Sequence, residues 1–141
     1  MRLLLDANVL LDCLVTEANC QARTGKAASD QVVDLCDRRV HQGLLAWNTL
    51  PILYYYYGKQ NESSLTAAML DDLMKVVEIP TVGHSDATNW RSYGITDFED
   101  ALQMASAIAG GADVIITRNV IDFAGAGLPA MTPEHFLNSS P

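Results

Sequence analysis

The sequence lacks a cysteine pairing pattern, a cluster of basic residues and an apolar run long enough to cross a membrane. Its three cysteines, Cys13, Cys20 and Cys36, have no C-x-x-C spacing and lie inside apolar patterns, so we expect reduced thiols in the core. The apolar N-terminus is interrupted by Asp6 and Asp12, well before the roughly 20 residues that a membrane helix needs. These features argue against a disulfide scaffold and a membrane span, and favour a cytoplasmic location.

Basic residues are also scarce. Nine Lys and Arg stand against 17 Asp and Glu, which gives a formal net charge of −8 at pH 7. This balance argues against a broad basic face that binds polyanions without specificity. A substrate that carries phosphate stays open, because acidic side chains that bind divalent cations form a locally positive pocket. The positions of the acids therefore matter more than their number.

The length and composition indicate an ordinary globular protein. The chain has 141 residues, of which 49% are hydrophobic and 18% are charged, and this suits one domain over residues 1–141 with a single core. No long segment has the polar composition of a disordered region. We expect the whole chain to fold, with the tail at 138–141 as the one candidate exception.

Apolar runs alternate with helical patterns along the chain. We predict strands at 2–6, 44–47, 76–79, 113–117 and 129–131, and helices at 7–15, 27–41, 49–59, 65–76, 85–93, 97–109 and 132–136. Asn48, Ser63 or Ser64, and Thr132 are the expected N-caps, and Gly43 is expected to stop the helix before it. The alternation indicates an α/β fold with a mostly parallel central sheet. The carboxyl ends of its strands should share one edge, where such sheets bind ligands.

Acidic side chains arrive at this edge from three segments. Asp6 ends the first strand, Asp122 follows the strand at 113–117, and residues 97–100 begin the helix before that strand. Like charges in one place raise each other's pKa unless protons or cations offset the repulsion. Oxygen ligands without a His or Cys cluster favour Mg²⁺ or Mn²⁺. Such a site typically activates water and stabilises the charge on a phosphodiester during in-line displacement.

The stretch "ITDFED" at 95–100 also has a structural interpretation. Thr96 and Glu99 have the spacing of a capping box, and Asp97 lies in the first turn, where the helix dipole favours an anion. We therefore assign Glu99 to the cap and leave Asp97 open between helix start and metal ligand. Neither the cap nor the core requires Asp100, so a functional role is expected for it.

The segment after the fourth strand leaves two roles open. Asn119 either supports metal ligands or forms the turn. Arg118 either contacts a phosphate or pairs with Asp100 or Asp122.

Four motifs together resemble the PIN domain family. They are "LLLDANVLLD" at 3–12, "DFEDALQMASA" at 97–107, "IITRNVIDF" at 115–123 and "LPAMTPEHFL" at 128–137. The resemblance covers nearly the whole chain and implies a three-layer α/β/α sandwich. It further implies Mg²⁺- or Mn²⁺-dependent cleavage of RNA, with water attacking phosphorus, by the toxin of a toxin–antitoxin pair.

The resemblance also assigns the site residues. Asp6, Asp100 and Asp122 match the catalytic acids of PIN domains. The implied metal ligands are Asp6, Asp97, Asp100 and Asp122, and the implied auxiliary residues are Asn119 and Thr117. The implied partners are an RNA substrate and an antitoxin protein.

One departure from the family pattern leaves an alternative function. PIN nucleases usually place an acid early in the helix after the second strand, but the stretch at 48–59, "NTLPILYYYYGK", has none, and Asn48 is the nearest polar substitute. Asp97 or Glu99 could compensate, or the chain could be a degenerate PIN domain that binds RNA or a protein without cutting. A phosphatase that uses Asp6 as nucleophile is a third hypothesis, although the D-x-D-x-T pattern of such enzymes is absent.

Four consecutive tyrosines, Tyr54 to Tyr57, occupy successive helical positions in that same stretch, so they point all round the helix. They cannot all be buried in one core. Packing and a homodimer interface are one interpretation, and stacking of bases is the other.

Overall fold

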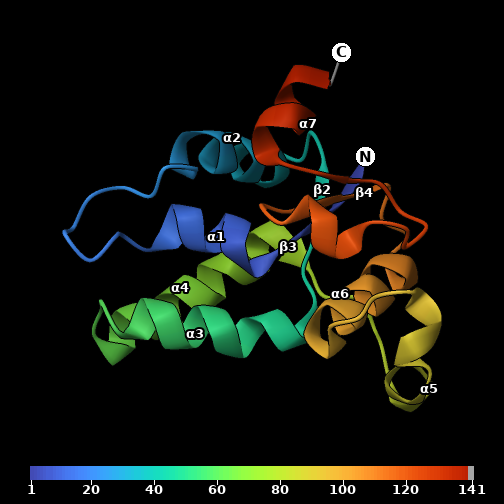
Figure 1. The fold of residues 1–141 in the computed structure, drawn as a ribbon. Helices are drawn as coiled ribbons and strands as arrows, with labels where there is room; N and C mark the ends of the chain where they lie inside the picture. Colours follow the sequence, from blue (N-terminus) through green and yellow to red (C-terminus); the bar gives the residue numbers. More distant parts are fainter. Residues whose placement is uncertain (140–141) are drawn as a thin grey trace.

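The computed structural model describes residues 1–139 and is built around a five-stranded sheet (Figure 1). The strands are β1 (Arg2–Leu5), β2 (Gln42–Leu44), β3 (Val77–Glu78), β4 (Val114–Ile116) and β5 (Ala130–Met131). Their order is β3-β2-β1-β4-β5, and every neighbouring pair in this sheet is parallel. The predicted α/β fold with a parallel central sheet is confirmed, and the first strand of the chain lies at the centre of the sheet.

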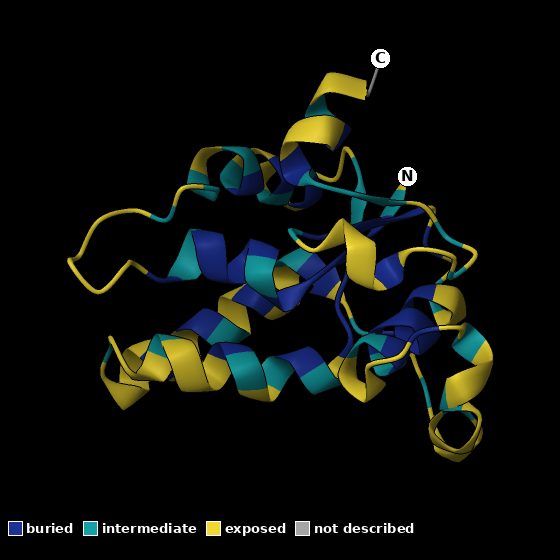
Figure 2. Ribbon diagram, viewed as in Figure 1, coloured by how far each residue is buried: buried dark blue, intermediate teal, exposed yellow. Residues whose placement is uncertain are grey.

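Helices cover both faces of the sheet, which makes the predicted three layers. Along β1, Leu3 and Leu5 face one hydrophobic core and Leu4 faces the other, because successive strand residues point to opposite faces. The first core is covered by α1 (Ala7–Leu14), α2 (Lys26–Asp37), α3 (Leu50–Gly58), α4 (Ser63–Val76) and α7 (Pro133–Ser139). The second is covered by α6 (Phe98–Ala109) and the short helix η2 (Trp90–Tyr93). Figure 2 shows the buried residues concentrated in the sheet and on the inward sides of these helices.

The second strand begins earlier than predicted. It lies at Gln42–Leu44, so the expected range of 44–47 was wrong, and Gly43 lies inside the strand, well past the end of α2 at Asp37. A Cβ at Gly43 would lie 3.2 Å from Val77 Cγ1 and 3.3 Å from Cys36 Cβ. The glycine is therefore explained by close packing between β2, β3 and α2, and the interpretation as a helix stop was wrong.

Two of the predicted N-caps are not found. Residues Trp47–Thr49 form a short 3₁₀ helix, η1, that leads into α3, so Asn48 caps no helix. Helix α4 begins at Ser63, with Glu62 in the capping position and no side-chain cap. Thr132 is confirmed as a cap, because its hydroxyl accepts a hydrogen bond from His135 N at 3.2 Å.

The remaining differences are local. The predicted helix at 85–93 is split into α5 (His84–Thr88) and η2, and the turn after β4 contains a further 3₁₀ helix, η3 (Val120–Phe123). In the predicted tail, residues 138 and 139 belong to α7, while residues 140 and 141 lie outside the described residues.

The cysteines and the hydropathy of the helices bear on two further predictions. All three cysteines are free; Cys36 is buried and Cys13 is half-buried, but Cys20 is exposed, so its assignment to the core was wrong. Cys20 lies in the loop before α2 and has a positive φ of 61°. Within residues 1–139, no helix has both the length and the apolarity to cross a membrane.

Candidate active site

The strand order reverses at β1, and this places a ligand-binding position between β1 and β4. The chain adds β2 and β3 on one side of β1 and then β4 and β5 on the other. Leu5 is in register with Ile116, and Asp6 N donates to Ile116 O at 3.0 Å, so both strands end side by side. Open α/β sheets bind ligands at this reversal, outside the carboxyl ends of the strands. Asp6 and Thr117 are the first residues beyond those ends.

The Asp6 carboxylate is buried and is oriented by a threonine. Asp6 is only 6% exposed, and Thr117 Oγ1 donates to Asp6 Oδ2 at 2.7 Å. The same hydroxyl accepts from Asn119 N at 3.0 Å, which directs its single proton to Asp6. A buried carboxylate needs such partners. Thr117 therefore fixes the direction of Asp6 toward the edge of the sheet.

Helix α6 begins with a different cap from the predicted one. Asp97 is the N-cap residue, with extended backbone angles, and its Oδ1 accepts a hydrogen bond from Asp100 N at 3.1 Å. The predicted capping box of Thr96 and Glu99 was wrong. Aspartate is as good an N-cap as threonine, so the helix begins one residue later and Asp97 takes the capping role. The Glu99 side chain is consequently left without a capping function.

The acids of three segments interact electrostatically. The Asp100 carboxyl is half-buried, and its pKa is raised from the ordinary 3.8 to about 6, first by burial and then by the negative charges of Asp97, Asp6, Asp122 and Glu99. Burial also raises the pKa of Glu99, with further contributions from Asp97 and Asp6. The acidic cluster, defined as Asp6, Asp97, Glu99, Asp100 and Asp122, thus shares one electrostatic environment at the carboxyl edge of the sheet.

Glu99 and Asn48 were considered only as substitutes for the missing acid, and neither was predicted as a metal ligand or catalytic residue. Asn48 Nδ2 donates to Glu99 O at 3.3 Å and so connects η1 to the first turn of α6. We predicted from the sequence that Glu99 takes part in the cap of this helix, but Asp97 is the N-cap in the structure. A run of three acids with only one capping position contained the signal, because only one of them could serve as the N-cap.

Asp122 and Asn119 lie on the exposed turn after β4. Asp122 N donates to Asn119 O at 3.0 Å, which forms the first turn of η3. Asn119 takes part through its backbone, so its turn-forming role is directly visible. Asp122 contributes its negative charge to the environment of Asp100.

The chemistry of the acidic cluster suits a hard divalent cation. Its donors are all carboxylate oxygens, the ligands that Mg²⁺ and Mn²⁺ prefer, and their mutual repulsion calls for a positive charge. In the described part of the chain, however, no three Asp, Glu, His or Cys side chains are close enough together to form a ready-made cation site. The carboxylates must therefore turn toward one another to share an ion.

Arg118 belongs to a separate ion-pair network that is partly buried. Its Nε donates to Asp12 Oδ2 at 2.7 Å, and its Nη1 donates to both oxygens of Glu134 at 2.7 Å. This hydrogen bond lowers the pKa of Glu134 below its ordinary value. The predicted pairing of Arg118 with Asp100 or Asp122 was wrong. The guanidinium points away from the acidic cluster, toward α1 and α7.

Asp12 is the centre of this network. It is only 3% exposed, and besides Arg118 it accepts from Arg23 Nε at 3.0 Å and from Ser29 Oγ at 2.9 Å. Arg118 Nη2 also donates to Gly25 O at 2.6 Å, and a Cβ at Gly25 would lie 2.1 Å from that nitrogen. Gly25 is therefore needed for close approach. The network holds the backbone between Thr117 and Asn119 in place beside Asp6.

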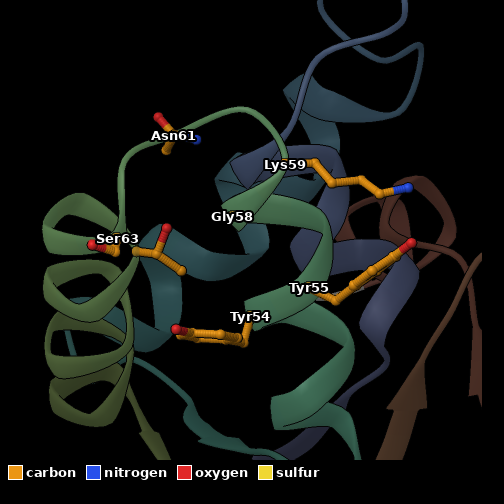
Figure 3. A pocket seen from close by; sticks show the side chains of 7 residues that line it. Tyr54, Tyr55, Gly58, Lys59, Asn61 and Ser63 are labelled. Carbon is orange, nitrogen blue, oxygen red and sulfur yellow. The ribbon is translucent and has the colours of Figure 1, made fainter.

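The tyrosines of α3 lie away from the acids. Tyr54, Tyr55 and Tyr56 are exposed, while Tyr57 packs against the first core. Figure 3 shows Tyr54 and Tyr55 pointing to opposite sides of α3, with Tyr55 beside Lys59, whose Nζ lies 4.5 Å from the centre of its ring. A hollow of about 360 Å³ lies between α3 and α4, and none of the acidic cluster lines it. This hollow is therefore not part of the candidate active site.

Solved structures with a similar fold include chains of the VapBC and FitAB complexes. A chain of VapBC2 from Rickettsia felis, solved bound to a promoter DNA fragment, is 16% identical with a TM-score of 0.67, and the match covers 94% of this chain and 98% of that one. A chain of VapBC-1 from nontypeable Haemophilus influenzae is 13% identical with a TM-score of 0.65, covering 95% and 99%. A chain of FitAcB from Neisseria gonorrhoeae is 17% identical with a TM-score of 0.62, covering 94% and 99%.

At these identities the likeness shows the fold alone, and no curated protein is similar enough in sequence to count as a match. The family is shown by the sequence itself. Residues 2–121 match the family model described as "PIN domain", and this span contains β1, β4 and four of the five acids of the acidic cluster, while Asp122 lies directly after it. The chain therefore belongs to the PIN domain family.

Proposed function

We propose that the protein is a Mg²⁺- or Mn²⁺-dependent endoribonuclease that hydrolyses RNA phosphodiester bonds. The observation that carries this proposal is the acidic cluster at the strand reversal, where burial and neighbouring charges raise the pKa of Asp100 to about 6. A repulsive group of carboxylates costs stability unless it binds something positive. Membership of the PIN family, whose members are typically nucleases, supports the same function.

In this proposal Asp6, Asp97, Asp100 and Asp122 hold the metal, and Asp6, Asp100 and Asp122 are the catalytic acids. A divalent ion bound there would activate water and stabilise charge on the scissile phosphate. Asp6 is held in direction by Thr117, and Asn119 supports that hydroxyl through its backbone N–H. Asp97 also caps α6, so its ligand role requires its side chain to leave Asp100 N or to use its second oxygen. Glu99 is an additional acid of the same cluster.

Cleavage of RNA by the purified protein tests the proposal. With Mn²⁺, the protein should cut single-stranded RNA, and Asp6→Asn or Asp100→Asn should each lower the rate by at least about 100-fold, because each removes a charge from the metal site. Asp34→Asn, which changes an exposed acid on α2, is the matched control and should leave the rate unchanged. Cutting that persists in both variants, or in excess EDTA, would contradict a metal-dependent mechanism at this site.

Two observations favour a second function. Helix α3 carries no acid where PIN nucleases usually have one, and the described side chains do not form a ready-made cation site. The alternative is a degenerate PIN domain that binds RNA or a protein partner without cutting. Titration with Mn²⁺ separates the two functions, since a chain with all five acids intact that fails to bind the ion would support the alternative.

We further propose that the chain is one domain and acts in the cytoplasm as the toxin of a toxin–antitoxin pair. The support is the fold, which is shared with chains of the VapBC and FitAB complexes. An antitoxin segment would inhibit by covering the acidic cluster. We also propose a homodimer, for which the exposed Tyr54, Tyr55 and Tyr56 of α3 offer an aromatic surface.

A further inference from the structure

Two large aromatic side chains beside the acidic cluster are exposed to solvent. Trp47, in η1, is 66% exposed, and Phe98, the first residue of α6, is 48% exposed. Their chain neighbours Asn48 and Glu99 are hydrogen-bonded to each other, so η1 and α6 meet at this point. Exposed apolar surface gathered at one place marks a binding site more often than scattered single residues do. Trp47 and Phe98 thus lie on two separate segments that meet beside Glu99.

An arginine stacks on Trp90, the ring that packs against Phe98. The Trp90 ring lies edge-on to Phe98 with 5.3 Å between centres, and the Arg91 guanidinium lies 4.5 Å above Trp90. Most basic side chains pair with acids; these are Arg2, Arg23, Lys26, Arg38, Lys75 and Arg118. Over residues 1–139, Arg91 makes no ion pair and is exposed. It therefore offers its charge to an anion from outside the molecule.

These features suit an RNA single strand. A chain with a net charge of −8 and few unpaired cations must gain much of its affinity for a polyanion from uncharged contacts. Stacking of a base on an aromatic side chain contributes about 1–3 kcal/mol and tolerates any sequence. Stacking of this kind needs bases that are free of a duplex, as they are in single strands and loops. Arg91 supplies a positive charge that can contact a phosphate of the same strand.

We propose that Trp47 and Phe98 stack bases of a single-stranded RNA beside the acidic cluster, while Arg91 contacts a phosphate of the same strand. This inference rests on the proposed nuclease function. Trp47, Phe98 and Arg91 are positioning residues, since they bind and orient the strand and none belongs to the acidic cluster. They place a phosphate at Asp6 and Asp100 in spite of the negative charge there.

Binding is measured first in the Asp100→Asn background, so that RNA is not consumed. The probe is a fluorescein-labelled single-stranded RNA of about 12 nucleotides, within the span of known single-strand sites. Trp47→Leu and Phe98→Leu should each weaken binding by roughly 5- to 150-fold, the loss of one stacked base. Tyr55→Leu removes an equally exposed aromatic side chain on α3 and should leave the affinity unchanged.

Two further readouts separate positioning from a loss of structure. Arg91→Met should make the slope of log affinity against log salt shallower by about 0.7, the value for one phosphate of a single strand. With the acids intact and Mn²⁺ present, Trp47→Leu should raise KM by the same factor as the loss of affinity and leave kcat nearly unchanged. Because Trp47 and Phe98 are exposed, circular dichroism and the unfolding midpoint should match those of the parent protein.

Three results would overturn the inference. Unchanged affinity in Trp47→Leu and Phe98→Leu would remove the stacking role, and persistent Mn²⁺-dependent cleavage would show that the proposed nuclease function survives. Weakened self-association in these variants, with RNA binding unchanged, would assign the rings to a protein contact. Absence of RNA binding by the parent protein, together with absence of cleavage, would overturn both the inference and the proposed function.

Discussion

Replacement of Asp100 by asparagine should make the protein more stable in the absence of divalent cations. The folded-state pKa of Asp100, about 6, lies above its ordinary value of 3.8 because of burial and the charges around it. A carboxyl group with a raised pKa favours the folded state when protonated and opposes folding when ionised. The wild-type protein therefore loses stability as the pH rises from 3.8 through about 6, and the penalty is constant above that range. Asp100→Asn removes this penalty.

The size of the effect follows from the pKa and the position of the residue. A rise from 3.8 to about 6 corresponds to a ceiling of about 3 kcal/mol, at roughly 1.4 kcal/mol per pKa unit. Solvent reaches the half-buried carboxyl, and the dipole of α6 favours an anion in its first turn by about 0.3–1 kcal/mol. Both effects lower the expected gain to about 1 kcal/mol.

Urea unfolding in EDTA measures this gain. Asp100→Asn should exceed the wild-type protein in free energy of unfolding at about pH 8, and the two should converge below about pH 3, where Asp100 is protonated in both the folded and the unfolded state. Asp86→Asn is the control of opposite sign. Asp86 accepts hydrogen bonds from Gly83 N and Tyr93 Oη, which lower its pKa, so its replacement should destabilise the protein.

Addition of Mn²⁺ should reverse the order of the two proteins at about pH 8. The ion stabilises only the chain that binds it, by an amount that grows with the logarithm of its concentration. The wild-type protein should therefore gain stability, and Asp100→Asn should gain little. A variant that is less stable than the wild-type protein at about pH 8 in EDTA would refute the reasoning, because the acids would then not repel one another in the folded state.

Two further predictions concern the residues that support the site. Arg118→Met should lower the free energy of unfolding by about 1.5–3 kcal/mol in urea titrations, because it removes one charged partner of the buried Asp12. Arg38→Met, in an exposed pair, should cost less than about 1 kcal/mol, and similar small losses in both variants would contradict a stabilising role of the network around Asp12. Thr117→Val should lower Mn²⁺ affinity by roughly 10- to 100-fold in calorimetric titration, since it removes the hydroxyl that orients Asp6; unchanged affinity would show that Asp6 needs no such support.

Much of the fold could be predicted from local patterns. The apolar run before Asp6 and the apolar stretch at 114–116 indicated buried parallel strands, and their carboxyl ends do meet at the reversal of the sheet. The periodic apolar residues of α6 gave its end correctly at Ala109. These elements could be predicted because hydrophobic periodicity and the rules of parallel sheets act within one segment or one crossover.

Two errors came from contacts between distant segments. Arg118 could not be paired correctly, because its partner Asp12 lies 106 residues away and Glu134 lies on a helix whose docking no local pattern defines. Gly43 was taken for a helix stop, whereas its reason is the packing of Val77 and Cys36 against it. The start of α6 is a local error: the spacing of Thr96 and Glu99 suggested a capping box, but Asp97, the better N-cap residue type, takes that position.

The position of β1 has a consequence for the order in which the protein is made. The ribosome releases β1 first, yet the neighbour that completes its pairing, β4, emerges only near the end of synthesis. The hydrogen bond that orients the Asp6 side chain cannot form until Thr117 is made, 111 residues later. Such long-range pairing closes late in folding. A nascent or truncated chain that ends before β4 therefore carries Asp6 and Asp100 but has no assembled site.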